Sequence, residues 1–77
     1  MAISTQQFAA CESYLTSCPI TGDTVQAECF MLAKIAGSTN ATILARASAA
    51  AAQVASLATK ASNSDTHLIL TAYWASL

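Results

Sequence analysis

The first half of the chain carries apolar residues at the spacing of two amphipathic helices. In residues 4–17 and 23–36 they recur every three or four positions, at Phe8, Cys11, Leu15, Val25, Cys29 and Leu32. Ser4 or Thr5, together with Gln7, can cap the first helix, and Pro19 ends it because the residue before a proline avoids helical geometry. We therefore predict an N-terminal helical hairpin that turns near residue 20.

The second helix has start and stop signals of its own. Asp23 and Gln26 stand at the spacing of a capping box, with Asp as the capping residue. Gly37 follows the last apolar position and can adopt the left-handed conformation that commonly ends a helix. These signals place the second helix between residues 23 and 36.

A longer, alanine-rich third helix is predicted for residues 41–61, with Asn40 as its cap. Its apolar seam alternates steps of four and three, at Ile43, Ala47, Ala50, Val54, Leu57 and Ala61. A 3.5-residue repeat of this kind is typical of a helix that lies along a partner. The alternative is a solvated helix filled with alanine, the best helix former. We favour close packing, because a solvated helix of this length normally carries more charge.

The last stretch places Leu70, Tyr73, Trp74 and Leu77 on one helical face, after a capping region at residues 63–65. Residues 66–75 also have high strand propensity, but no second strand is visible to pair with them. We predict a short C-terminal helix. The fold prediction is thus one all-α domain over residues 1–77, a small bundle of three to four short helices.

Composition narrows the function classes. The chain holds 18 Ala, 9 Ser and 9 Thr among 77 residues, 9% of its residues are charged, and its formal net charge is -1. Without a basic patch, binding to nucleic-acid phosphates or to an anionic membrane surface is not expected. A neutral surface of this kind favours burial against another protein.

Targeting signals are not evident. Residues 43–61, the nearest approach to a transmembrane segment, are interrupted by Arg46 and Lys60 among other polar residues. The first residues carry no basic region followed by an apolar run, so we expect no signal peptide and synthesis in a cytoplasm.

Three cysteines are the first candidates for chemistry. In the predicted hairpin, Cys11 and Cys29 lie at the same level and can face one another. They form either a disulfide or a pair of buried thiols. We favour buried thiols, because Cys18 leaves the cysteine count odd. The cysteine spacing does not resemble a zinc site, and we expect neither metal nor cofactor.

Catalysis is not predicted. His67, the only histidine, is interpreted as a capping or surface residue, since no cysteine is flanked by a nucleophile motif. Glu12 and Glu28 share a level of the hairpin and can be neighbours, but two isolated, solvated carboxylates are the simpler interpretation.

The function expected is that of a non-enzymatic assembly subunit, a homo-oligomer or multi-copy component. In overall composition the chain resembles minor structural proteins of tailed bacterial viruses, which decorate, cement or connect larger shells, and this implies a final location in a virion. The expected interface residues are Ile43, Ala47, Ala50, Val54, Leu57, Tyr73 and Trp74. The alternative is a small secreted helical protein, bridged between Cys11 and Cys29, that encloses a lipid-like ligand.

Overall fold

The computed structural model describes residues 3–19, 22–47, 51–60, 62 and 64–77, and these residues contain no β-strand. The elements are α1 (Thr5–Ser17), α2 (Asp23–Phe30), the π-helix η1 (Met31–Ile35), α3 (Ala41–Arg46), α4 (Ala51–Ala55), the short 3-10 helix η2 (Leu57–Thr59) and α5 (Asp65–Ala75). The all-α prediction is confirmed. The described part of the chain forms five α-helices, where three or four were expected.

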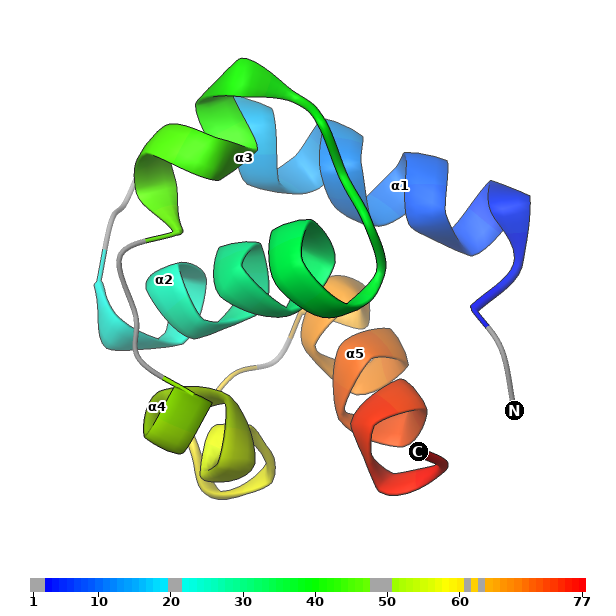
Figure 1. Ribbon diagram of the computed structural model, residues 1–77, viewed down its shortest axis with the longest axis vertical. Helices are drawn as coiled ribbons and strands as arrows, with labels where there is room; N and C mark the ends of the chain where they lie inside the picture. Colours follow the sequence, from blue (N-terminus) through cyan, green and yellow to red (C-terminus); the bar gives the residue numbers. More distant parts are fainter. Residues whose placement is uncertain (1–2, 20–21, 48–50, 61, 63) are drawn as a thin grey trace.

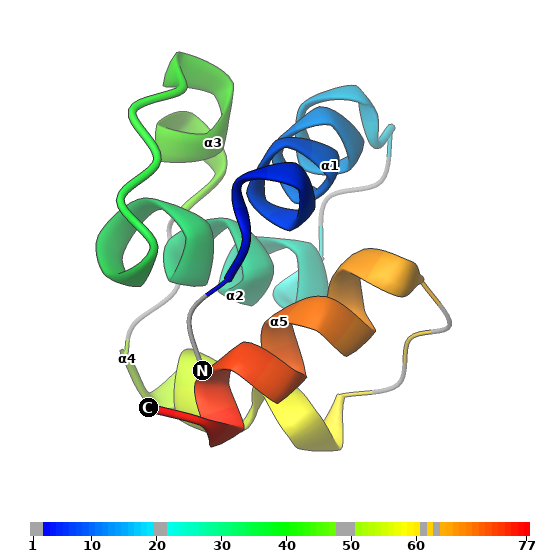
Figure 2. The same cartoon turned by 90° about the vertical axis from the view of Figure 1, so that its right-hand side faces the viewer.

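Helix α2 and its continuation η1 run through the middle of the molecule (Figure 1). Helices α1 and α3 lie on one side of this central rod, and α4 and α5 lie on the other (Figure 2). Helices α1 and α2 run in opposite directions and pack against each other. The molecule measures 27 × 25 × 22 Å, so each helix reaches the core with one face.

Both ends of α1 follow from local sequence. The Ser4 side chain accepts a hydrogen bond from the Gln7 backbone N–H, and the Gln7 side chain accepts one from the Ser4 N–H, each at 3.1 Å. This is the reciprocal capping box. At the other end Cys18 is extended, with ψ 122°, as the position before Pro19 requires.

Helix α2 begins one residue away from the predicted cap. Gly22 occupies the N-cap without a side-chain bond, and Asp23 is the first helical residue. The predicted Asp23 capping position is therefore wrong, although a carboxylate in the first turn still favours the helix electrostatically. At the far end Gly37 has φ +86°, as predicted, and the Ser38 N–H bonds the Leu32 carbonyl at 2.8 Å.

Helix α3 starts at the predicted cap. The Asn40 side chain accepts hydrogen bonds from the N–H groups of Thr42, at 2.9 Å, and Ile43, at 3.2 Å. Two of the four N–H groups that a helix leaves unpaired at its start are satisfied in this way.

Replacing the cap tests this assignment. Asn40→Ala is expected to lower the free energy of unfolding by about 1 kcal/mol, because both N–H groups lose their acceptor. Thr39→Ala, at the exposed position next to it, should change stability by less than about 0.5 kcal/mol. Urea unfolding followed by circular dichroism measures both. Equal losses for the two variants would contradict the capping role of Asn40.

The single long third helix is not present. Helix α3 ends at Arg46, and Ala47 has ψ 63°, outside the helical region; helix α4 starts afresh at Ala51. A straight helix over residues 41–61 would be about 30 Å long at 1.5 Å per residue, longer than the whole molecule. The chain instead bends, so that its apolar residues wrap around α2.

Arg46 fixes the place of this bend. Its Nη1 atom donates hydrogen bonds to the carbonyl oxygens of Leu15, at 2.7 Å, and Cys18, at 2.8 Å. Carbonyls in the last turn of a helix lack intrahelical donors, and a cation there also offsets the helix dipole. Arg46 therefore joins the end of α3 to the end of α1.

The core gathers side chains from every helix around α2. Its buried members are Cys11, Leu15, Ala27, Cys29, Met31, Leu32, Ile43, Val54, Leu57 and Leu70. Helix α5 closes the core from below in Figure 1. Its N-cap is Ser64, whose side chain accepts from the His67 N–H at 3.1 Å. The helical prediction for this segment is confirmed.

Candidate functional site

The structure places the predicted seam in the interior of the chain. Ile43, Val54 and Leu57 are at most 1% exposed and belong to the core. Ala47 is half-buried and packs against them. The remaining interface position of this group, Ala50, lies outside the described residues. In the single chain these buried side chains form part of the core.

Helix α5 has apolar residues on both of its faces. Tyr73 and Trp74 are half-buried and pack against the core. The outer face presents Leu68, Ala72 and Ala75, at steps of four and three. Leu68 is 61% exposed. We call these three residues the α5 outer face.

Charge is nearly absent from this helix. Its acidic and basic side chains are Asp65, which is exposed in the first turn, and His67, which is buried. A helix that is hydrophobic all round is normally covered on all sides. In the single chain, α5 is covered on the inner side alone, and the α5 outer face is therefore the candidate functional site.

The cysteines are buried thiols. Cys11 and Cys29 are wholly buried, no disulfide joins them, and Cys18 is also buried. Burial raises the pKa of Cys11 and raises the pKa of Cys29 to about 11. Because the thiolate is the reactive form, a thiol of this kind is a poor nucleophile at neutral pH. It acts as a small hydrophobic side chain.

The two glutamates were interpreted as isolated and solvated, and the structure places neither of them fully in solvent. Glu12 is half-buried and accepts a 2.6 Å hydrogen bond from the Ser38 hydroxyl, which ties α1 to the segment after η1. Glu28 is 1% exposed. Within the described part of the chain, its Oε2 atom has no hydrogen-bond partner. Burial raises the Glu28 pKa to about 7.

Sequence reasoning missed Glu28, although a signal existed. Val25, Glu28, Cys29 and Leu32 follow the steps three, one and three, which form one helical stripe. The apolar face assigned to the second helix therefore extends over Glu28. His67 was likewise expected at the surface and is 4% exposed, with no hydrogen-bond partner for Nδ1 among the described residues.

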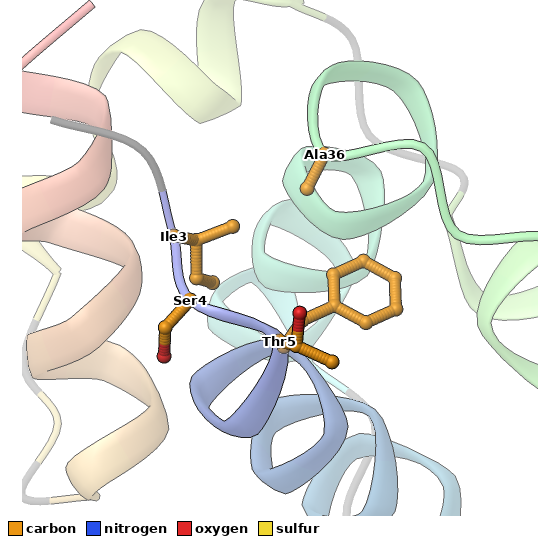
Figure 3. A pocket seen from close by; sticks show the side chains of 5 residues that line it. Ile3, Ser4, Thr5 and Ala36 are labelled. Carbon is orange, nitrogen blue, oxygen red and sulfur yellow. The ribbon is translucent and has the colours of Figure 1, made fainter.

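An open pocket of about 290 Å³ lies beside the start of α1. Its walls are formed by Ile3, Ser4, Thr5, Phe8 and Ala36. Figure 3 shows Ile3 and Thr5 on the N-terminal segment and Ala36 on the opposite wall. The lining holds no ionisable side chain, and the pocket is open to solvent.

Two other classes of site find no support in the described residues. There, no group of three or more His, Cys, Asp or Glu side chains is placed to hold a metal ion. Nor does any helix in the described ranges have the length and apolar character needed to cross a bilayer.

Comparison of the chain with protein-family models, with curated proteins and with solved structures finds no match.

Proposed function

We propose that the chain is a non-enzymatic assembly subunit that pairs with a second copy of itself through the α5 outer face. The observation that carries this proposal is the exposure of Leu68 and its alanine neighbours on a helix that is apolar all round. Covering this face removes apolar surface from water, at about 25 cal/mol per Å².

The small residues of the α5 outer face favour a second copy of α5 as the partner that covers it. In an antiparallel pair centred on Ala72, the two Ala72 residues meet at the two-fold axis. Leu68 of each copy then lies over Ala75 and Ser76 of the other. Small side chains at the crossing point let two helices approach closely, and an isologous contact needs such self-complementarity.

Charge favours the antiparallel orientation. A parallel pair would bring the two Asp65 carboxylates together, and like charges repel. The antiparallel pair centred on Ala72 separates them by more than the length of the 11-residue helix. The net charge of -1 also adds little repulsion between copies.

A matched pair of lysine substitutions tests the proposal. Leu68→Lys is expected to weaken association tenfold or more, because it replaces the largest apolar side chain of the contact with an ammonium group that must remain hydrated. Leu44→Lys places the same charge on α3, where Leu44 is 44% exposed, and should leave association unchanged. Sedimentation equilibrium measures both constants. Equal effects, or no effect of Leu68→Lys, would contradict pairing through α5.

Composition supports one kind of assembly. A small, weakly charged helical subunit that pairs with itself suits a decorating, cementing or connecting role in a larger shell, such as the virion of a bacterial virus. This proposal predicts that the chain co-purifies with intact particles in many copies. Quantitative mass spectrometry of purified particles measures that number, and a complete absence from them would exclude this setting.

A further inference from the structure

The central rod ends in a π-helix that its own sequence does not explain. Element η1 has the sequence Met-Leu-Ala-Lys-Ile. Four of these five residues are among the best helix formers, and the segment contains neither glycine nor proline. Single π-helical turns at the end or in the middle of α-helices are rare and often mark functional sites. Local sequence therefore favours an α-helix here, and the π-helix must be imposed by contacts with other parts of the chain.

Two backbone hydrogen bonds show how far the π-helix departs from an α-helix. In an α-helix the Ala36 N–H would bond the Leu32 carbonyl, whereas here it bonds the Met31 carbonyl at 3.0 Å. In the motif that commonly ends an α-helix, the Ser38 N–H would bond the Ala33 carbonyl, whereas here it bonds the Leu32 carbonyl at 2.8 Å. Both bonds are displaced by one residue in the same direction. We call the observed pattern the π register and the undisplaced pattern the α register.

A side chain of α1 holds the residue that follows this π-helix. The Ser38 hydroxyl donates a hydrogen bond to the Glu12 Oε2 atom at 2.6 Å, and Ser38 is 5% exposed. A hydrogen bond to a carboxylate is one of the stronger kinds in proteins. The same hydroxyl accepts a hydrogen bond from the N–H of Asn40, the cap of α3, at 3.3 Å. Ser38 is therefore held both by α1 and by the start of α3.

The α register is incompatible with this arrangement. A shift of one residue in hydrogen-bond register turns the residues that follow by about 100° around the helix axis. Such a turn would carry the Ser38 hydroxyl away from Glu12 and break the bond between them. Because the bond forms in one register and is broken in the other, it stabilises the π register relative to the α register.

We propose that the hydrogen bond between Glu12 and Ser38 is a conformational switch at the end of the central rod. With the bond in place, residues 31–36 hold the π register. Without it, the same residues return to the α register that their sequence favours. The switch lies within one chain and does not depend on the association of copies.

The register also determines one wall of the pocket beside α1. Ala36 directly follows η1 and forms the wall opposite Ile3 (Figure 3). A turn of about 100° at Ala36 moves its side chain out of this wall. A change of register therefore remodels the pocket, so that the state of a hydrogen bond behind η1 alters a surface of the molecule.

Nuclear magnetic resonance couplings across backbone hydrogen bonds, measured at one fixed pH, identify the register directly. In the wild-type chain the Ala36 nitrogen should couple to the Met31 carbonyl carbon. In Ser38→Ala and in Glu12→Ala it should couple to the Leu32 carbonyl carbon in most molecules. The segment itself favours an α-helix, and losing a hydrogen bond to a charged group shifts the ratio of the two registers by about tenfold or more.

A conservative variant and a control separate the switch from a general loss of stability. Glu12→Gln retains an acceptor oxygen and should keep the coupling to Met31. Ser17→Ala removes a hydroxyl that bonds the Ser13 carbonyl of its own helix at 2.9 Å, and it should also keep that coupling. A coupling to Met31 that persists in both Ser38→Ala and Glu12→Ala would overturn the proposal. So would a wild-type chain that already shows the coupling of the α register.

Discussion

Leu70→Ala is expected to lower the free energy of unfolding by about 2 to 5 kcal/mol. Leu70 is completely buried in the core cluster. Truncating it removes apolar contacts and leaves a cavity that the surrounding helices fill only in part. Domains of this size have a small free energy of unfolding. A substantial fraction of Leu70→Ala molecules should therefore be unfolded at room temperature.

The control lies two residues away on the same helix. Leu68→Ala makes the same chemical change where the side chain is 61% exposed, and it should cost less than about 0.5 kcal/mol in the monomer. Both changes alter helix propensity equally, so the difference between them reports burial alone. Urea unfolding by tryptophan fluorescence, in dilute solution, measures the two values. Similar values would contradict the docking of α5 described above.

Glu28→Gln is expected to remove a pH dependence from the stability of the whole chain. The folded state raises the Glu28 pKa from 4.5 to about 7, so it binds the proton more tightly than the unfolded state does. The contribution of Glu28 to the free energy of unfolding is then largest below pH 4.5, and this contribution is lost as the pH rises through 7. Between pH 5 and pH 8 the loss should be about 2 to 3 kcal/mol.

The measurement is a pair of stability curves against pH. The wild-type curve minus the Glu28→Gln curve cancels the other titrating groups and should fall by about 2 to 3 kcal/mol from pH 5 to pH 8. The constant offset between the curves reflects the buried amide and is not diagnostic. A difference curve that is flat, or that rises with pH, would show that Glu28 is not desolvated in the folded chain.

Helix boundaries were predicted best where they depend on neighbouring residues. The Ser4 and Gln7 capping box, the Asn40 cap and the positive φ of Gly37 are set by groups within a few residues of each other. Such signals can be predicted because they depend only on a short stretch of sequence. The Asp23 cap was predicted one residue too late, because Gly22 needs no side chain to occupy that position.

The predicted long third helix is an example in which local sequence signals gave the wrong structure. Residues 41–61 combine high helix propensity with a regular apolar seam, and both favour an unbroken helix. The bend at Ala47 comes from distant residues, through the bonds of Arg46 to the end of α1 and the small size of the molecule. Propensity gives way to such tertiary constraints.

Periodicity also does not separate a core seam from an interface. A residue such as Val54 or Leu57 on an apolar seam can fill the core of its own chain or face a partner, and the spacing is identical in both cases. In α5 the sequence placed Leu70 on the same helical face as Tyr73 and Trp74, and Leu70 is completely buried; the spacing did not tell whether that face packs on the chain's own core or on a partner. Packing of α5 against α1 settles this choice.

The mass of the unmodified chain in solution shows whether two copies associate. Sedimentation equilibrium under reducing conditions, from about 10 µM to 1 mM, covers the range expected for a small interface. If two copies pair through the α5 outer face, the mass should rise with concentration from 7.9 kDa towards twice that value. A folded chain that stays at 7.9 kDa throughout this range would contradict this pairing.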